Sequence, residues 1–305
     1  MGSVRAMRKG ATAPQTWSAA ADRFLAERDL APGSRRVYGL TLHRVGQHLD
    51  NATVGSVTEH DLAVAVEAGY PSASPAAWNR HVATLRSFST WCARQGWMTR
   101  DPTGLLEGRH VPVDHDRAMS RQRVEQILTH RDLVVRDRCL FRMLFETAAR
   151  SNEVLRLNVE DLDQPRKRAS TVRKGGDLDV IHWQTGTARL LPYLVAGRSL
   201  GPLFLAEGAP TPSRAPAARD LDEATGRARL SYRRAAEVFK ATSGGATLHQ
   251  LRHSALTHLA EDGVPLPLLM AKSRHESLRT LQRYARPSVE SVARLTAEHD
   301  PARRR

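Results

Sequence analysis

Residues 249–288 read HQLRHSALTHLAEDGVPLPLLMAKSRHESLRTLQRYARPS and hold most of the chemically active side chains of this chain. His249 and Arg252 are three positions apart, and His275 stands nine positions before Tyr284. A further arginine, Arg150, lies upstream in the segment ETAARSNEVLRL. Imidazole moves protons, guanidinium neutralises anions and a phenol can act as a nucleophile. This combination is typical of a site that cleaves phosphodiesters.

The charge of the chain is strongly positive. The 305 residues contain 46 Lys and Arg against 32 Asp and Glu, a net charge of +14, and the pI is near 10.8. Only five of the basic residues are lysines, so nearly all of the positive charge is guanidinium, which binds phosphate in a two-pronged way. This composition favours a nucleic-acid partner. A merely soluble basic protein, or an arginine bias inherited from genome base composition, remains the plain alternative.

The two cysteines, Cys92 and Cys139, are far apart and show no zinc-binding spacing. They do not form a disulfide framework and fit a reducing cytosol. No stretch approaches eighteen uninterrupted apolar residues, and the first residues lack the apolar core of a signal peptide. We therefore expect a cytoplasmic protein that is not associated with a membrane.

The chain is long enough for two domains. Residues 16–106 carry the apolar spacing of amphipathic helices, and residues 1–15 are expected to form a flexible N-terminus. Residues 107–119, EGRHVPVDHDRAM, have no apolar period and predict a linker. The helices of the first domain are expected over residues 17–25, over residues 32–49, from residue 58 onward and over residues 74–95.

Local signals support two of these helix starts. Pro32 suits the first turn of a helix, with Ser34 at a cap position. Thr58 followed by Asp61 resembles a capping box. The aromatic side chains of the helix over residues 74–95 are predicted to belong to a core rather than to a surface that stacks on bases.

The second domain is expected over residues 120–305. A capped helix follows Ser120, and a strongly apolar helix then leads to Arg150 near its end. Two strand-like segments flank Lys174, with Gly175 and Gly176 supplying a turn signal. Residues 208–218 predict a loop, either an insertion or a mobile flap. Helices are further expected over residues 230–240, 248–261 and 266–270.

The spacings H-x-x-R and H with nine positions to Y resemble the active-site box of the tyrosine recombinases, the phage-integrase and Xer-like strand-exchange enzymes. The exit GWMTRDP, residues 96–102, is similar to the G-x-x-x-x-N-P exit of their core-binding domain, with Asp in place of Asn. The resemblance covers nearly the whole chain. It implies a mainly α fold with a small antiparallel β-sheet, in which a helical core-binding domain precedes an α+β catalytic domain.

The resemblance also assigns roles to residues. Tyr284 would attack the phosphorus and form a 3′-phosphotyrosyl bond, with His249 as base or proton relay and His275 bonding a phosphate oxygen. Arg150 and Arg252 would hold the scissile phosphate. Two further residues complete the predicted set: Lys174 would protonate the leaving 5′-oxygen, with Lys167 as its rival, and Glu153 would orient the site or be an ordinary surface charge.

Two positions depart from the family pattern. The family usually has T-G-[LM]-R and L-G-H where this chain has Ala148 and Arg274 in place of the glycines. Alanine narrows the backbone choices of glycine. Arg274 either adds a phosphate contact or hinders the turn. Because neither departure removes a catalytic group, we expect activity with altered site preference.

The family implies a site-specific recombinase that acts on double-stranded DNA as a homotetramer, without cofactor or metal ion. It leaves room for an accessory protein and does not distinguish integration, excision or transposition of a mobile element from dimer resolution. A C-terminal helix after Tyr284 would dock on a neighbouring protomer or fold back on its own domain.

Three other functions are weighed against this one. A type IB topoisomerase would use the same chemistry as a monomer. A catalytically silent DNA-binding or architectural protein would keep the fold alone. A zinc hydrolase is suggested by His249 and His253, which are four apart, but Gln250 occupies the place of the general-base glutamate in H-E-x-x-H.

Overall fold

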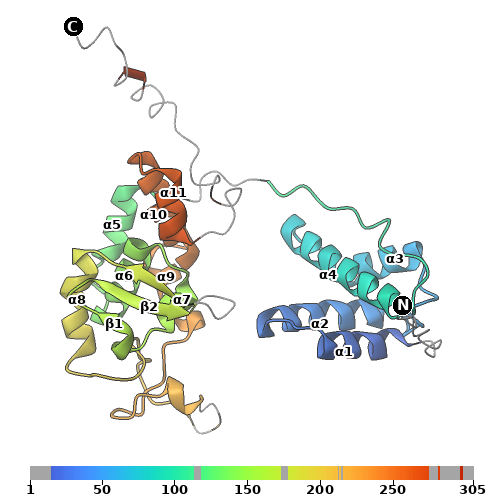
Figure 1. Cartoon of the computed structure of the whole chain (residues 1–305), viewed down its shortest axis with the longest axis horizontal. Coiled ribbons are helices and arrows are strands. Elements are labelled where there is room, and N and C mark those ends of the chain that lie inside the picture. The colour runs from blue at the N-terminus through green and yellow to red at the C-terminus, as the bar shows by residue number, and fades with distance from the viewer. Residues whose placement is uncertain are drawn as a thin grey trace, which may run out of the picture. The chain divides into compact units, whose positions relative to one another are not determined.

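The structure is a computed structural model that describes residues 15–112, 118–172, 178–211, 213, 216–274, 281 and 296–297. The chain divides into two compact units, Met1–Val113 and Asp114–Arg305 (Figure 1). No helix of the described part is long and apolar enough to cross a membrane.

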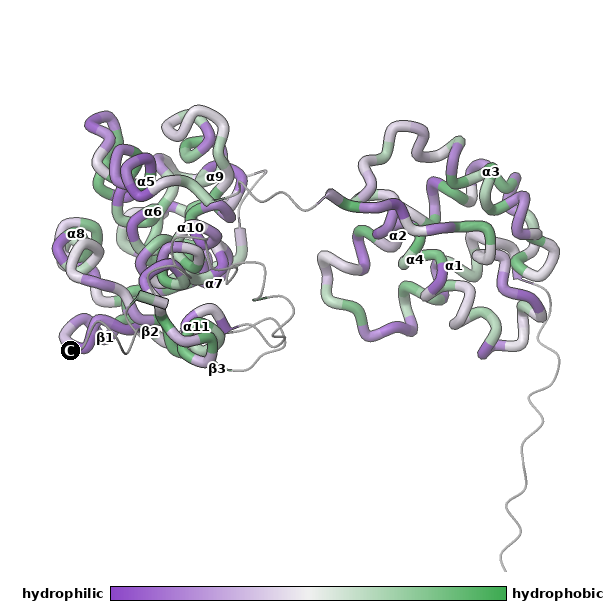
Figure 2. The backbone as a smooth tube through the Cα atoms, turned by 90° about the horizontal axis from the view of Figure 1, so that it is seen from above, coloured by the Kyte–Doolittle hydropathy of each residue, from purple (hydrophilic) through white to green (hydrophobic). Residues whose placement is uncertain are grey.

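The first unit is helical, and aromatic side chains fill its core. Phe24 and Phe88 are fully buried, with ring centroids 5.5 Å apart in an edge-to-face contact, and Trp17 lies 5.0 Å from Phe88. The aromatics of the last helix are buried, which confirms that they belong to the core. Figure 2 shows hydrophobic and hydrophilic residues alternating along the helices that supply this core. The helices are α1 (Trp17–Glu27), α2 (Pro32–Gln47), α3 (Glu59–Gly69) and α4 (Pro75–Arg94).

The helix starts follow the local signals with one exception. Thr58 and Asp61 form the predicted capping box of α3, with the Asp61 amide donating to Thr58 Oγ1 at 3.2 Å. Pro32 begins α2 as predicted, but its N-cap is Ala31, and Ser34 lies inside the helix. The cap position assigned to Ser34 is therefore wrong, because the fixed φ of proline already starts the helix two residues earlier.

The segment that follows α4 and its loop is bonded to the helical unit. The Trp78 indole donates to the Glu107 carbonyl at 2.8 Å, and the Asn79 side chain exchanges two hydrogen bonds with the backbone of Arg109. The Arg109 guanidinium lies 3.7 Å from the Trp78 ring centroid and pairs with Glu67 at 3.0 Å. The first residues of the stretch 107–119 are thus tied to the first unit, and the two units divide inside this stretch.

The second unit contains a three-stranded antiparallel sheet in the order β1-β2-β3, with β1 (Leu162–Asp163), β2 (Arg168–Val172) and β3 (Leu178–His182). In the register of β2 and β3, Thr171 pairs with Asp179 and Ala169 with Ile181. The two strand-like segments around Lys174 therefore form the predicted antiparallel pair. Lys167 lies in the turn between β1 and β2 instead, where its φ is +50°.

Helices pack against this sheet, and α6 lies at the centre of the helix contacts, packing against α8, α10, α5 and α9. Phe141 of α6 and Phe239 of α9 are fully buried with centroids 4.9 Å apart. Helix α8 is not among the predicted helices, because Pro192 interrupts its pattern. The helices are α5 (Arg121–Leu128), α6 (Val135–Thr147), α7 (Ser151–Leu155), α8 (Thr185–Val195), α9 (Tyr232–Thr242), α10 (Leu248–Glu261) and α11 (Leu266–Ser273).

The described part of the predicted loop 208–218 contains no α-helix and no strand, and it leads into a short 3-10 turn, Ala218–Asp220. Arg229 anchors the chain beyond it: its guanidinium pairs with Asp220 at 2.7 Å and donates to the carbonyls of Leu155 and Leu157. These bonds attach the end of the loop to the chain that follows α7.

Candidate active site

The backbone before Arg150 makes a tight left-handed turn. Helix α6 ends at Thr147, and Ala148 adopts φ 51° and ψ 27°. Thr147 bonds the Met143 carbonyl at 2.7 Å and accepts from the Ala149 amide at 3.1 Å. Arg150 is then the N-cap of α7. The apolar pattern predicts Arg150 near the end of the long helix, whereas Arg150 follows that helix and opens a short one.

Arg150 and Glu153 form a local pair. Arg150 Nη1 donates to Glu153 Oε1 at 2.9 Å, and the Arg150 amide donates to Oε2 at 2.9 Å. The Arg150 side chain is 46% exposed while that of Glu153 is 6% exposed. Glu153 is thus not an ordinary surface charge. It is a buried carboxylate that holds a half-exposed guanidinium.

The pKa of Glu153 reflects these neighbours. Burial acts to raise the pKa of the carboxyl, but the charge of Arg274 and the hydrogen bonds from Arg150 outweigh it. The net result is a pKa below the usual range. Glu153 is therefore a carboxylate at neutral pH.

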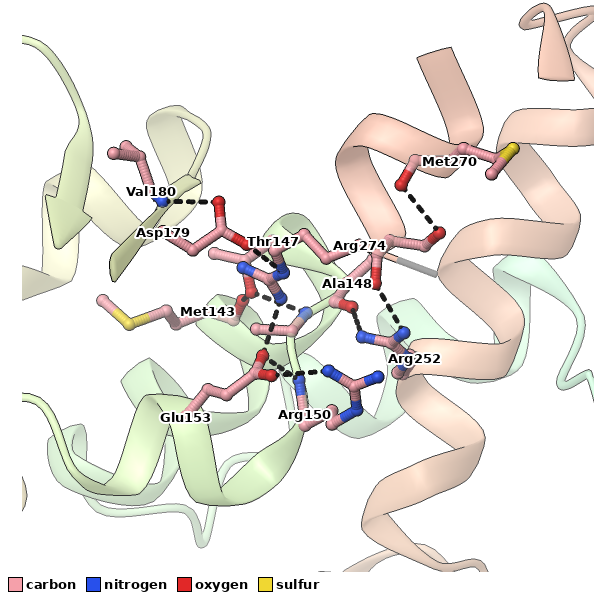
Figure 3. A network of polar contacts seen from close by, with 12 residues as sticks. Met143, Thr147, Ala148, Arg150, Glu153, Asp179, Val180, Arg252, Met270 and Arg274 are labelled. Atoms are coloured by element: carbon pink, nitrogen blue, oxygen red, sulfur yellow. Dashed lines mark hydrogen bonds and ion pairs between the residues drawn. The ribbon is translucent and has the colours of Figure 1, made fainter. Parts of the chain in front are cut away.

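Arg252 joins the ends of two helices. From α10, its Nη1 donates to the Ala148 carbonyl at 2.6 Å and its Nη2 donates to the Ser273 carbonyl at 2.7 Å (Figure 3). Ala148 follows α6 directly, and Ser273 is the last residue of α11. A cation at the C-terminal end of a helix is favoured because the last carbonyls lack partners within the helix. The side chain is buried, with the residue 2% exposed.

Arg274 has the second left-handed backbone, with φ 56° and ψ 41° at the end of α11. Its Nη2 donates to Glu153 Oε2 at 2.7 Å, and its Nε lies 3.7 Å from Asp179 Oδ2. The side chain is 4% exposed. The turn forms without glycine, so the expectation that Arg274 hinders it does not hold. The guanidinium faces two carboxylates, and its contact with a phosphate stays a prediction.

His249 is the second residue of α10, is exposed, and lies one turn before Arg252. The Thr247 amide donates to Gln250 Oε1 at 2.8 Å, so Gln250 closes the capping box of this helix. That role explains a glutamine where a zinc hydrolase would need a general base. Within the described residues, no three His, Cys, Asp or Glu side chains are grouped to hold a metal ion.

Lys174, His275 and Tyr284 lie outside the described residues. Lys174 falls in the connection between β2 and β3, and His275 directly follows Arg274 in the chain. Of the predicted set, the structure therefore brings Arg150 and Glu153 into contact. It connects Arg252 to the backbone two residues before Arg150 and two residues before His275.

Asp179 is a member of this network that the sequence analysis did not identify. Its side chain also accepts from the Val180 amide at 2.8 Å. The one feature of the sequence that could have pointed to Asp179 is its place in the strand that follows Lys174. A single aspartate in a short strand carries no pattern, and its partner is nearly a hundred residues away in the chain.

A helical unit, a second unit with a small antiparallel sheet, and buried arginines at the junction of α6, α7 and α11 define the architecture of a tyrosine recombinase. A sequence model of the phage integrase family matches residues 117–291, which is more than half of the chain. The chain belongs to the phage integrase family.

Curated relatives agree over most of the length. The chain is 29% identical to the tyrosine recombinase XerC of Mycobacterium sp. (strain JLS) over 299 residues, covering 92% of this chain and 96% of XerC. It is 30% identical to XerC of Mycobacterium tuberculosis (strain ATCC 25177 / H37Ra), covering 84% of this chain and 85% of that protein. It is 27% identical to XerD of Xanthomonas axonopodis pv. citri (strain 306), covering 92% and 95%.

Solved structures share the fold. A lambda integrase tetramer bound to a Holliday junction matches with a TM-score of 0.71 and 13% identity, covering 90% of this chain and 78% of that one. The Tn1549 transposon integrase in complex with circular intermediate DNA matches with a TM-score of 0.67 and 16% identity, covering 94% and 99%. The predicted fold class is therefore confirmed.

These findings make the chain a site-specific tyrosine recombinase, as the sequence analysis expected. Such an enzyme acts by transesterification through a tyrosine. Nothing among the findings favours the catalytically silent protein or the topoisomerase.

Proposed function

We propose that the chain cleaves and rejoins double-stranded DNA with Tyr284 as nucleophile and Arg150, Arg252, His249, His275 and Lys174 as its assisting groups. One observation carries the proposal: Arg252 bonds the backbone just before Arg150 and just before His275, so three separate motifs converge on one guanidinium.

In the proposed cleavage step the Tyr284 oxygen attacks the phosphorus while the bond from phosphorus to the 5′-oxygen breaks. His249 takes the phenol proton, because a free phenol with a pKa near 10 is ionised only on the order of one part in a thousand at pH 7. Lys174 gives a proton to the departing 5′-oxygen. The 3′-phosphotyrosyl product conserves the linkage, and a 5′-hydroxyl of another strand reverses the step.

The arginines act on the charge of the transition state. Arg150 is half-exposed and fixed at its base by Glu153, which suits a guanidinium that meets a phosphate. Arg252 is buried and already bonded to two carbonyls. The guanidinium that we propose to contact the phosphate is thus the same group that bonds the chain at the ends of α6 and α11.

Double-stranded DNA is the proposed partner, and the net charge of +14 supports it. The lambda integrase, which shares the fold, is a tetramer bound to a Holliday junction in its solved structure. We propose the same assembly here, with the C-terminal helix of one protomer docking on the next. DNA as substrate implies a cytoplasmic enzyme. An accessory protein is compatible with this scheme.

The role of Lys174 can be tested with a DNA strand that carries sulfur in place of the bridging 5′-oxygen. A thiolate leaves without a proton, so Lys174→Ala should slow cleavage of ordinary DNA and leave cleavage of the sulfur strand close to that of the wild type. Lys167→Ala is the matched control and should cleave both at the wild-type rate. An equal defect of Lys174→Ala on both strands would contradict the assignment.

The assembly can be tested with a chain truncated after residue 288. Sizing of the full chain and of the truncated chain on DNA should show a larger complex only for the full chain. An unchanged complex would remove the C-terminal helix from the assembly.

A further inference from the structure

Arg274 occupies a position that is costly for it in two ways. Its backbone lies in the left-handed region, where a side chain with a Cβ is disfavoured relative to glycine. Its guanidinium is buried at 4% exposure, where an unpaired charge would be strongly unfavourable. Both costs are offset only if the side chain makes strong interactions at this point.

We propose that Arg274 is a positioning residue of the recombination site, one that holds α7, β3 and the chain leading into His275 in a single arrangement through Glu153 and Asp179. This inference rests on the function proposed above. No part of it follows from the family pattern, which has glycine here and thus no side chain to make these contacts.

The contacts join the three parts that the chemistry needs. Glu153 also binds Arg150, so the bond at 2.7 Å from Arg274 bears on the placement of Arg150. Asp179 stands on β3 immediately beyond the connection that contains Lys174, and the ion pair spans 3.7 Å. Arg274 itself precedes His275. One guanidinium therefore contacts Glu153 and Asp179, and the backbone of the same residue leads into His275 (Figure 3).

The charges lead to the same role. Arg150 and Arg274 carry two positive charges, and Glu153 and Asp179 carry two negative ones, so the set is neutral. Removal of Arg274 would leave the set with a net negative charge beside the place where a phosphate has to bind. Arg274 thus balances the negative charge of Glu153, so that Glu153 can position Arg150 without cancelling the positive charge of Arg150.

The test compares single-turnover cleavage of a suicide duplex with equilibrium binding to the same DNA. Arg274→Gly restores the residue of the family pattern and relieves the left-handed backbone, yet we expect cleavage to fall by about tenfold or more, as small misplacements do in active sites. The dissociation constant should change less than about twofold, since the buried side chain does not reach the DNA. The matched control is Ala196→Gly, which relieves the same backbone strain at the exposed end of α8.

A second variant addresses folding. Asp179→Asn keeps the shape of a partly exposed side chain and should fold normally, with a smaller reduction in cleavage than Arg274→Gly. Methylguanidinium added to Arg274→Gly should restore part of the cleavage rate, whereas sodium chloride at equal ionic strength should not. A role in stability alone would not produce this rescue.

The outcomes separate the two proposals. Wild-type cleavage rates in both Arg274→Gly and Asp179→Asn would overturn the role of Arg274 and leave the proposed function intact. A parallel loss of binding and cleavage would also overturn it. Absence of covalent adducts in the wild type would overturn the proposed function, and this inference with it.

Discussion

At the scale of single residues, the site depends on a carboxylate that two guanidinium groups share. Glu153 accepts from Arg150 and from Arg274. The carboxylate and the Arg274 guanidinium are buried, whereas the Arg150 side chain is half-exposed. The loss of one partner of such a group leaves the others uncompensated. Glu153 should therefore matter for stability as well as for cleavage.

Glu153→Gln should lower the free energy of unfolding at pH 7 by about 3 kcal/mol. Because the folded state lowers the pKa of Glu153, its contribution is present above the ordinary pKa and is lost as pH falls through the folded-state pKa. The difference between wild type and variant should thus narrow below about pH 4. Urea unfolding at several pH values measures it, and a difference that stays constant with pH would argue against the ionised carboxylate.

Ala148 tests the backbone separately from charge. Its left-handed conformation costs about 1 kcal/mol relative to glycine, and its buried methyl group contributes about as much. Ala148→Gly should therefore change the free energy of unfolding by less than about 1 kcal/mol. Ala196→Gly, at the same conformation but exposed, should stabilise the protein by about 1 kcal/mol. Urea unfolding midpoints of both variants test these two values. A large loss of stability in Ala148→Gly would mean that burial of the methyl group contributes more than the left-handed backbone costs.

At the scale of elements, Arg252 connects the ends of α6 and α11. A lysine ammonium cannot reproduce the geometry of two parallel N–H donors. Arg252→Lys should lower the free energy of unfolding by about 2 kcal/mol, whereas Arg150→Lys, at a half-exposed side chain, should lower it by less than about 1 kcal/mol. Both should reduce cleavage by about a hundredfold. Thermal unfolding and adduct yield measured side by side check this contrast; equal stability losses would refute the idea that Arg252 holds both helix ends.

The elements also show what a sequence can predict. Helix α4 and the capping box of α3 were predictable because apolar spacing and the Thr58–Asp61 pair are local signals. Helix α8 was not, since Pro192 lies inside it. The role of Arg274 depends on Glu153, 121 positions away, and no local pattern reveals a contact of that separation. The candidate site residues were chosen from their spacing, while the network around Glu153 required the fold.

At the scale of the whole molecule, the excess of positive charge should govern affinity for DNA. If the two units contact six to ten phosphates, raising salt from 50 to 200 mM should weaken binding by about a thousandfold or more. Fluorescence anisotropy with a labelled duplex measures this slope. Tyr284→Phe is the control and should show the same slope, because its change leaves the charge unaltered. An affinity that hardly depends on salt would contradict a broad basic interface.

The central claim is that Tyr284 forms a covalent bond with DNA. The most direct measurement incubates wild type and Tyr284→Phe with nicked suicide duplexes taken from DNA that flanks the gene, and looks for complexes that survive SDS. The account predicts an adduct at the 3′ side of a break for the wild type and none for the variant. Sequence-selective binding by the wild type without any adduct, or an adduct that persists in Tyr284→Phe, would contradict it.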